Sequence, residues 1–234
     1  MHKVYIFDVD GTLTPSRREM DKEFVQFFFD FCTLNDVYLV TGSDKDKTVE
    51  QIGNVIYNLC RRVYNCSGND VWESGKNIYN NDWVLPEDCT GFLQNKLNES
   101  RFPLRTGLHF EHRPGMVNFS IVGRNATIGE RKLYVKHDEA INERNTIAKL
   151  FNGKFPTILA QPGGETGIDI YPKGFDKSQI IKDFNDSDNL YFFGDRMDVD
   201  GNDYTLAEAV KLKNGKSYQV NDWTDTWNHL KEFI

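Results

Sequence analysis

The sequence has few cysteines and no net positive charge, and both features limit what the protein does. Its 234 residues include four cysteines, Cys32, Cys60, Cys66 and Cys89, with no Cys-x-x-Cys pair among them. This density is too low for a disulfide framework, so we expect a reducing compartment. A formal net charge of −7 leaves no global basic character, which argues against a protein that binds nucleic acid.

Long apolar runs, internal repeats and low-complexity tracts are missing as well. No stretch approaches the length that spans a membrane, and the first strand pattern begins so early that we expect no signal peptide. We therefore expect a soluble cytoplasmic protein without a membrane partner. The 39% hydrophobic and 13% aromatic content supports a real core, in one large domain or two small ones.

The most informative stretch lies at the N-terminus. The apolar run from Val4 to Phe7 reads as a buried strand and is followed by Asp8 and Asp10, then Gly11. Functional groups of doubly wound α/β sheets collect at the carboxyl ends of strands, and residues two apart on a strand share a face. Both carboxylates are therefore predicted to face one crevice.

Two adjacent carboxylates repel each other unless a cation or hydrogen bonds offset the repulsion. Mg²⁺ suits them, one aspartate can attack phosphorus, and the other can move a proton. The alternative is a strand end with a simple Asp-Gly turn. The strand followed by Asp8-Val-Asp-Gly-Thr-Leu-Thr14 resembles the first motif of the haloacid dehalogenase (HAD) phosphotransferase superfamily.

A second strand, Val37 to Val40, ends in Thr41-Gly42-Ser43-Asp44 and leads into a helix predicted from Lys45 to Leu59. Hydroxyl and backbone N–H groups at such a junction can hold a phosphate. A simple helix cap by Ser43 or Asp44 is the alternative.

The remaining pattern predicts a Rossmann-like α/β core of parallel strands, at residues 1–82 and 173–234, with an inserted α+β cap domain at 83–172. In the core before the cap we expect a helix over Met20–Leu34, a strand over Arg62–Cys66 and a polar stretch without assigned elements over Ser67–Asp82. After the cap the pattern resumes with a helix opening at Asp176-Lys177, strand Asn189–Phe193, helix Thr205–Val210, strand Ser217–Val220 and helix Thr224–Ile234. In the cap we expect two helices, Pro86–Asn98 and Ile128–Phe151. We also expect two hairpins, one of strands His109–Arg113 and Met116–Val122 and one of strands Thr157–Gln161 and Gly167–Tyr171.

Further polar residues fit phosphoryl chemistry. Lys177 is the natural cation for a transferring phosphoryl group, and Asp195 ends a strand opposite the first aspartates, where it would complete an oxygen cage for Mg²⁺. Asn202 and Asp203 follow; Asp203 fits either an orienting role behind the metal or ligation through water. Asp198 and Asp200 read better as a solvated acidic loop, and Lys177 alone would read as a solvated lysine.

Three arginines of the inserted block, Arg113, Arg124 and Arg131, stand out. Guanidinium groups suit bidentate recognition of phosphate. Together they predict a second phosphate site distant from the catalytic aspartates, whereas any one of them alone reads as ordinary surface charge.

Taken together, these motifs resemble eukaryotic-type phosphomannomutases along essentially the whole chain. The resemblance rests on four stretches: Asp8 to Arg17, Arg113 to Arg124 with Arg131, Gly163 to Lys177 with Asp169, and Phe193-Gly-Asp195 with Gly-Asn-Asp203. It implies that Asp8 is the nucleophile and Asp10 the general acid/base. It also implies that Asp8, the main-chain carbonyl of Asp10 and Asp195 hold Mg²⁺. The residues that would bind the sugar phosphate are Arg17, Arg113, Arg124, Arg131 and Asp169. The resemblance further implies a hexose 1,6-bisphosphate activator and a role in GDP-mannose biosynthesis, in a family that often dimerises through its cap.

Three positions depart from the family pattern. Gly167 stands where a serine is usual, Val199-Asp200-Gly201 replaces Pro-Gly-Gly, and the loop that binds a further cation has no match around Ala207 to Val210. The phosphate chemistry survives these changes, which bear on sugar selectivity.

The sequence thus predicts a mutase that interconverts mannose 6-phosphate and mannose 1-phosphate through an aspartyl-phosphate. The main alternative is a Mg²⁺-dependent sugar-phosphate phosphatase on the same scaffold, because related caps belong to phosphatases of sucrose phosphate and mannosyl-phosphoglycerate. A sugar-phosphate-binding protein without catalysis is disfavoured, since Asp8, Asp10, Lys177 and Asp195 are all present. A preference for mannose or glucose phosphates stays open.

Overall fold

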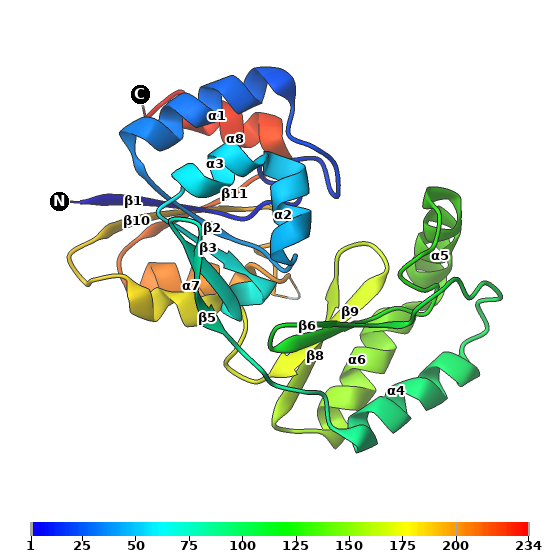
Figure 1. Cartoon of the computed structure of the whole chain (residues 1–234). Helices are drawn as coiled ribbons and strands as arrows, with labels where there is room; N and C mark the ends of the chain where they lie inside the picture. Colours follow the sequence, from blue (N-terminus) through cyan, green and yellow to red (C-terminus); the bar gives the residue numbers. More distant parts are fainter. Residues whose placement is uncertain (1, 200, 234) are drawn as a thin grey trace. The chain divides into compact units, whose positions relative to one another are not determined.

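The computed structural model describes residues 2–199 and 201–233 and divides into two compact units (Figure 1). The first unit joins the described residues up to Asn81 to those from Gly174 onward. The second unit is the continuous segment Asp82–Lys173. The chain therefore leaves the first unit once and returns to it once.

The first unit is built on a seven-stranded sheet in the order β11-β10-β1-β2-β3-β4-β5. The strands are β1 (Lys3–Phe7), β2 (Asp36–Val40), β3 (Arg62–Asn65), β4 (Asp70–Glu73), β5 (Lys76–Asn80), β10 (Asn189–Gly194) and β11 (Lys216–Gln219). The strands from β11 to β3 run parallel, whereas β4 and β5 pair antiparallel. Because β1 is flanked by the parallel strands β2 and β10, the loops after these three strands meet at one edge of the sheet.

Helices cover both faces of this sheet (Figure 1). One layer holds α1 (Lys22–Leu34), α2 (Lys45–Ile52), α3 (Asn54–Leu59) and α8 (Trp223–Leu230); the other holds α7 (Tyr204–Leu212) and the 3₁₀ helix η2 (Lys177–Asp183). Alternate residues of β1 serve the two layers: Tyr5 and Phe7 pack with the first, Val4 and Ile6 with the second. The apolar run of β1 is therefore buried on both sides, as parallel strands require.

The second unit carries an antiparallel sheet in the order β6-β7-β9-β8. Its elements are α4 (Glu87–Glu99), β6 (Phe110–Arg113), β7 (Met116–Phe119), α5 (Ile128–Ile141), α6 (Glu143–Lys154), β8 (Ile158–Gly163) and β9 (Gly167–Pro172). One face of the sheet packs its apolar residues, such as Phe119 and Ile170, into a core shared with the helices. The opposite face carries polar residues, which the pairings Glu111–Asn118 and Asn118–Asp169 place side by side.

The fold class predicted from the sequence is confirmed, but several elements differ. The long helix expected over 128–151 is two helices, because Asn142 adopts a left-handed conformation with φ of +55°. Asparagine tolerates this region better than most residues, so it can end one helix and begin the next. The helix expected over 45–59 is likewise divided, at Gly53.

Two further differences concern the first unit. Strands β4 and β5 form a hairpin inside Ser67–Asp82, where the sequence assigned no element. The last helix ends at Leu230, and Ile234, to which it was predicted to extend, lies outside the described residues. None of these differences moves the strand ends that carry the aspartates.

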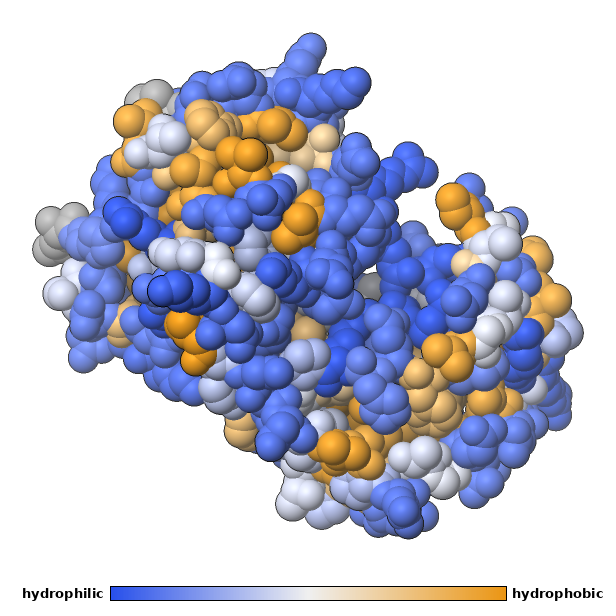
Figure 2. All heavy atoms as spheres, viewed as in Figure 1, coloured by the Kyte–Doolittle hydropathy of each residue, from blue (hydrophilic) through white to orange (hydrophobic). Residues whose placement is uncertain are grey.

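The face of the molecule in Figure 2 is largely hydrophilic, with hydrophobic patches interrupted by polar residues. Within the described part of the chain, no helix is both long and apolar enough to cross a membrane.

Candidate active site

The carboxyl end of β1 leads directly into a buried ion-pair cluster. The backbone N–H of Asp8 donates to the carbonyl of Phe193 at 2.9 Å, which ties the aspartate to the neighbouring strand β10. Lys177, only 1% exposed, extends its Nζ to Asp8 Oδ1 at 2.5 Å and to Asp203 Oδ1 at 2.7 Å. The structure thus brings together residues from three distant parts of the chain: the end of β1, the start of η2 and the start of α7.

Asp195, at the end of β10, joins this cluster. One carboxylate oxygen from each of Asp8, Asp195 and Asp203 lies within 4.8 Å of the others. Gly11 makes the approach of Asp195 possible, because a Cβ atom at this position would overlap the Asp195 carboxylate. The backbone φ of +79° at Gly11 also favours glycine. No other group of this kind occurs among residues 2–199 and 201–233.

The electrostatics of the cluster favour a further cation. Burial raises the pKa of Asp8, an effect that Lys177 opposes, and burial together with the nearby Asp203 raises the pKa of Asp195 to about 7. Burial would lower the pKa of Lys177, but Asp203 and Asp8 outweigh it and raise that pKa. Three carboxylates against one ammonium group leave excess negative charge, and hard oxygen ligands of this kind suit Mg²⁺.

The carboxylates of three aspartates form the cluster, and only some of the predicted metal ligands are among them. Asp203, for which the sequence left an orienting role or ligation through water, has its carboxylate inside the cluster, whereas the side chain of Asp10 is not a member. Asn202 is half-buried and Asp198 is exposed. Asp200, predicted as part of a solvated loop, lies outside the described residues.

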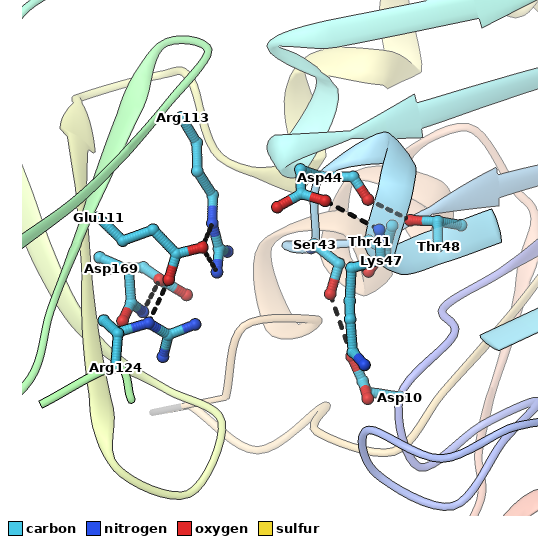
Figure 3. Close-up of polar contacts among 11 residues, drawn as sticks. Asp10, Thr41, Ser43, Asp44, Lys47, Thr48, Glu111, Arg113, Arg124 and Asp169 are labelled. Carbon is cyan, nitrogen blue, oxygen red and sulfur yellow. Dashed lines mark hydrogen bonds and ion pairs between the residues drawn. The ribbon is translucent and has the colours of Figure 1, made fainter. Parts of the chain in front are cut away.

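The side chain of Asp10 is held by three donors. Its Oδ1 accepts hydrogen bonds from the backbone N–H of Arg17 at 2.7 Å and from Nε2 of Gln51 at 2.9 Å. Its Oδ2 accepts a hydrogen bond from the hydroxyl of Ser43 at 3.4 Å, which Figure 3 shows. Arg17 presents its N–H from a left-handed backbone conformation with φ of +58°. Asp10 is thus a carboxylate whose orientation is fixed, two residues after Asp8.

The predicted phosphate loop makes two different uses of its polar residues. Asp44 caps α2 by accepting the N–H of Lys47 at 2.9 Å, so it fills the capping role that the sequence left open between Asp44 and Ser43. Ser43 instead donates to Asp10, and its own N–H bonds to the hydroxyl of Thr41 at 3.1 Å. Gly42, the remaining residue of the predicted phosphate loop, lies between Thr41 and Ser43.

Gln51 is a site residue that sequence reasoning missed. It is 2% exposed at the end of α2, and besides Asp10 its amide also donates to Thr14 Oγ1 at 3.1 Å. A glutamine on an amphipathic helix carries no local sign of such a role, because the contact spans 41 residues of sequence.

We expect Gln51→Leu to lower kcat about tenfold with little change in KM, because Asp10 loses a donor that fixes its proton-transfer geometry. Steady-state kinetics measures both parameters. Gln94→Leu, at an exposed position of α4, is the matched control. A variant at Gln51 with unchanged kcat would show that Arg17 and Ser43 suffice to hold Asp10.

In the second unit, two of the three predicted arginines meet at one carboxylate. Arg113 donates through Nε and Nη2 to Glu111 Oε1 at 3.0 and 2.9 Å, and Arg124 donates through Nε to Glu111 Oε2 (Figure 3). Burial would raise the pKa of Glu111, but the two arginines outweigh it and lower the pKa. The fork of two guanidinium groups around one anion is the geometry that suits a phosphate.

The third arginine pairs elsewhere. Arg131 is largely buried, and its Nη2 lies 3.4 Å from Glu165 Oε2. Asp169, on the polar face of the sheet, accepts from Nδ2 of Asn118 at 2.5 Å. Sequence reasoning missed Glu111, although its position two residues before Arg113 on one strand places both on the same face.

Comparison with known proteins identifies the family to which this chain is similar. The family model of eukaryotic phosphomannomutase matches residues 24–234. Phosphomannomutase 1 of Dictyostelium discoideum is 31% identical over 241 aligned residues, covering 99% of this chain and 96% of its own length. A phosphomannomutase of Spinacia oleracea is 31% identical, covering 89% of this chain and 87% of its own.

Solved structures share the fold at low sequence identity. A trehalose-6-phosphate phosphatase related protein superposes with a TM-score of 0.58 at 18% identity, covering 99% of this chain and 96% of its own. A HAD subclass IIB sugar phosphatase gives 0.61 at 16% identity, covering 99% of both chains. At these identities the likeness concerns the fold alone.

Proposed function

This chain belongs to the eukaryotic phosphomannomutase family and acts as an enzyme of that class, and we propose that it moves the phosphoryl group through Asp8. The reaction interconverts mannose 6-phosphate and mannose 1-phosphate. The observation that carries the proposal is the buried contact of Lys177 with Asp8 at the end of β1. A lysine there stabilises the negative charge of the oxygen that attacks phosphorus and of the phosphoryl group being transferred.

We infer a reaction in two halves. A hexose 1,6-bisphosphate gives its phosphoryl group to Asp8: the bond from the Asp8 oxygen to phosphorus forms as the bond from phosphorus to the sugar oxygen breaks. Asp10 donates the proton that this sugar oxygen takes up. In the second half, Asp10 accepts the proton of the attacking sugar hydroxyl while the phosphoryl group leaves Asp8.

We propose that Asp8, Asp195 and the main-chain carbonyl of Asp10 hold Mg²⁺, with Asp203 as a further ligand. The three clustered carboxylates support this assignment, because their excess charge fits a hard divalent cation. When bound, the ion offsets negative charge on the transferring phosphoryl group. Thr41, Gly42 and Ser43, together with Lys177, are proposed to hold that same group.

The polar face of the second unit is proposed to bind the rest of the substrate. Arg113, Arg124 and Arg131 would hold the phosphate that is not being transferred, and Asp169 would bind sugar hydroxyls. For the first unit, we propose Arg17 as a further residue that binds the sugar phosphate. The fork of Arg113 and Arg124 around Glu111 supports this assignment, since it already accommodates one anionic group. A phosphatase that acts on a monophosphate needs no such second anion site.

Removal of the metal tests the proposed ligands directly. Because an ion that binds only the folded state stabilises it, saturating Mg²⁺ is expected to raise the unfolding midpoint by about 5 °C or more. We expect Asp195→Asn to lose this shift, whereas Asp198→Asn, on an exposed side chain of the same loop, retains it. Differential scanning calorimetry with Mg²⁺ and with a chelator measures both. An undiminished shift in the Asp195 variant would overturn the assignment.

The fate of the phosphoryl group distinguishes a mutase from a phosphatase. Enzyme labelled by stoichiometric radioactive glucose 1,6-bisphosphate is mixed with mannose 1-phosphate, and the products are separated. A mutase transfers most of the label to the added sugar phosphate. A phosphatase releases it as inorganic phosphate at a rate that the sugar does not change, and this result would replace the proposal.

Cytoplasmic location and dimerisation through the second unit complete the proposal, with mannose 1-phosphate serving GDP-mannose synthesis. The four cysteines are buried thiols outside any disulfide, which suits a reducing compartment. Light scattering on the purified protein tests the dimer: a monomer mass would contradict it.

A further inference from the structure

Two glycines face each other across the polar side of the second unit's sheet. Gly163 of β8 pairs with Gly167 of β9. Neither residue has a positive φ, so backbone conformation does not call for glycine at either position. Instead, side chains of neighbouring strands occupy the room beside both glycines.

Asn118 fills the space beside Gly167. A Cβ atom built at residue 167 would lie 2.5 Å from Nδ2 and 2.7 Å from Oδ1 of Asn118, which is closer than real Cβ atoms approach. On the other side, a Cβ atom at Gly163 would overlap the carboxylate of Asp169. The amide and the carboxylate therefore occupy room that side chains on β8 and β9 would otherwise take.

Asn118 also makes a direct contact with Asp169. The two residues are paired across β7 and β9, and Nδ2 of Asn118 donates to Oδ1 of Asp169 at 2.5 Å. Asn118 is only 4% exposed, and its buried Oδ1 has no partner. A buried amide that leaves its own oxygen unpaired is costly, so this orientation is held by the carboxylate and by the room at Gly167.

We propose that Asn118 is the positioning residue for Asp169, and that the absence of a side chain at Gly167 leaves the room that the amide occupies. The amide turns the carboxylate so that its remaining acceptor sites meet the sugar hydroxyls. An ionised carboxylate only accepts hydrogen bonds. A hydroxyl donor binds more tightly to an acceptor whose orientation is already fixed, because less conformational freedom is lost on binding. This inference rests on the proposed function, because it takes Asp169 as a sugar-binding residue.

The pair also bears on sugar selectivity. With no side chain at Gly167, β9 offers no hydroxyl at that position, and discrimination among sugars by this strand depends on the direction of the Asp169 carboxylate. Discrimination then requires that Asn118 stay in place, because a site built to bond a hydroxyl rejects ligands that leave its polar groups unpaired.

The test is a set of three variants: Asn118→Ala, Gly167→Ser and the double variant. We expect Asn118→Ala to raise the KM and the calorimetric Kd for mannose 1-phosphate by about tenfold to hundredfold, the range for loss of a hydrogen bond to a charged group. In this variant we expect turnover at saturating substrate to stay within about threefold of the wild-type value, and labelling of Asp8 by acetyl phosphate to be unchanged. Neither process needs an oriented Asp169. A merely structural role would lower both of these readouts as well.

Gly167→Ser is expected to weaken binding at least as strongly, because the new side chain displaces the amide. Removing the amide makes room for the serine, so the double variant should bind more tightly than Gly167→Ser alone. If Asn118→Ala does not fold, Asn118→Ser carries the same expectation. Binding within twofold of wild type in the Asn118 variant, or wild-type behaviour of Gly167→Ser, would overturn the inference.

The readouts separate this inference from the proposed function. Binding of mannose 1-phosphate that depends on Asn118, in an enzyme that only releases phosphate, would contradict the mutase and keep the positioning role. Normal mutase activity with binding that is indifferent to Asn118 would contradict the positioning role alone.

Discussion

Asp8→Asn is expected to lower turnover by about 10⁴-fold or more and to abolish the phosphoenzyme, because a neutral amide cannot form the aspartyl-phosphate. The variant should still fold, since Lys177 keeps its contact with Asp203 at 2.7 Å. It also removes one of three mutually repelling carboxylates. Mass spectrometry of enzyme quenched after reaction with glucose 1,6-bisphosphate measures the adduct, alongside the assay of turnover.

Asp30→Asn, at an exposed position of α1, is the matched control and should be phosphorylated like the wild type. A phosphoryl adduct that persists in the Asp8 variant would move the nucleophile to another residue. Peptide mapping would then decide between Asp195 and Asp203, whose oxygens lie in the same cluster.

Lys177→Met has the largest expected effect on stability. Removing one partner of a buried ion pair leaves an uncompensated charge, and here two carboxylates, Asp8 and Asp203, lose their cation. We expect the free energy of unfolding in metal-free buffer to fall by about 3–5 kcal/mol, and turnover to be lost. Urea unfolding followed by circular dichroism measures the loss.

Mg²⁺ should restore part of this stability, because it supplies positive charge to the same carboxylates. Lys182→Met, on an exposed lysine of the same 3₁₀ helix, should leave stability nearly unchanged. If the Lys177 variant unfolded at the wild-type urea concentration without metal, Asp8 and Asp203 would not depend on the lysine charge.

The sequence was sufficient for the fold class and the family, because both depend on local patterns with a strong physical cause. A short apolar run followed by Asp8 and Asp10 is a buried parallel strand, and the strand that ends at Gly194, directly before Asp195, repeats the pattern. Since parallel strands end at the same edge, the meeting of Asp8 with Asp195 follows from topology. Membership of the phosphomannomutase family is confirmed by the matched family model.

What the sequence could not provide depends on register and on contacts between distant residues. The gap filled by Asn118 requires that Gly163 and Gly167 face each other and that β7 pairs in one particular register with β9. The contact of Gln51 with Asp10 depends on how α2 lies against the sheet. The break at Asn142 was missed because helical periodicity continues through it, and one left-handed residue leaves little trace in a pattern.

The measurement that tests the central claim most directly is ³¹P NMR of mannose 1-phosphate with the enzyme and Mg²⁺, recorded with and without a catalytic amount of glucose 1,6-bisphosphate. We predict conversion to mannose 6-phosphate that depends on the bisphosphate, with total sugar phosphate conserved. Accumulation of inorganic phosphate in place of mannose 6-phosphate would contradict the account.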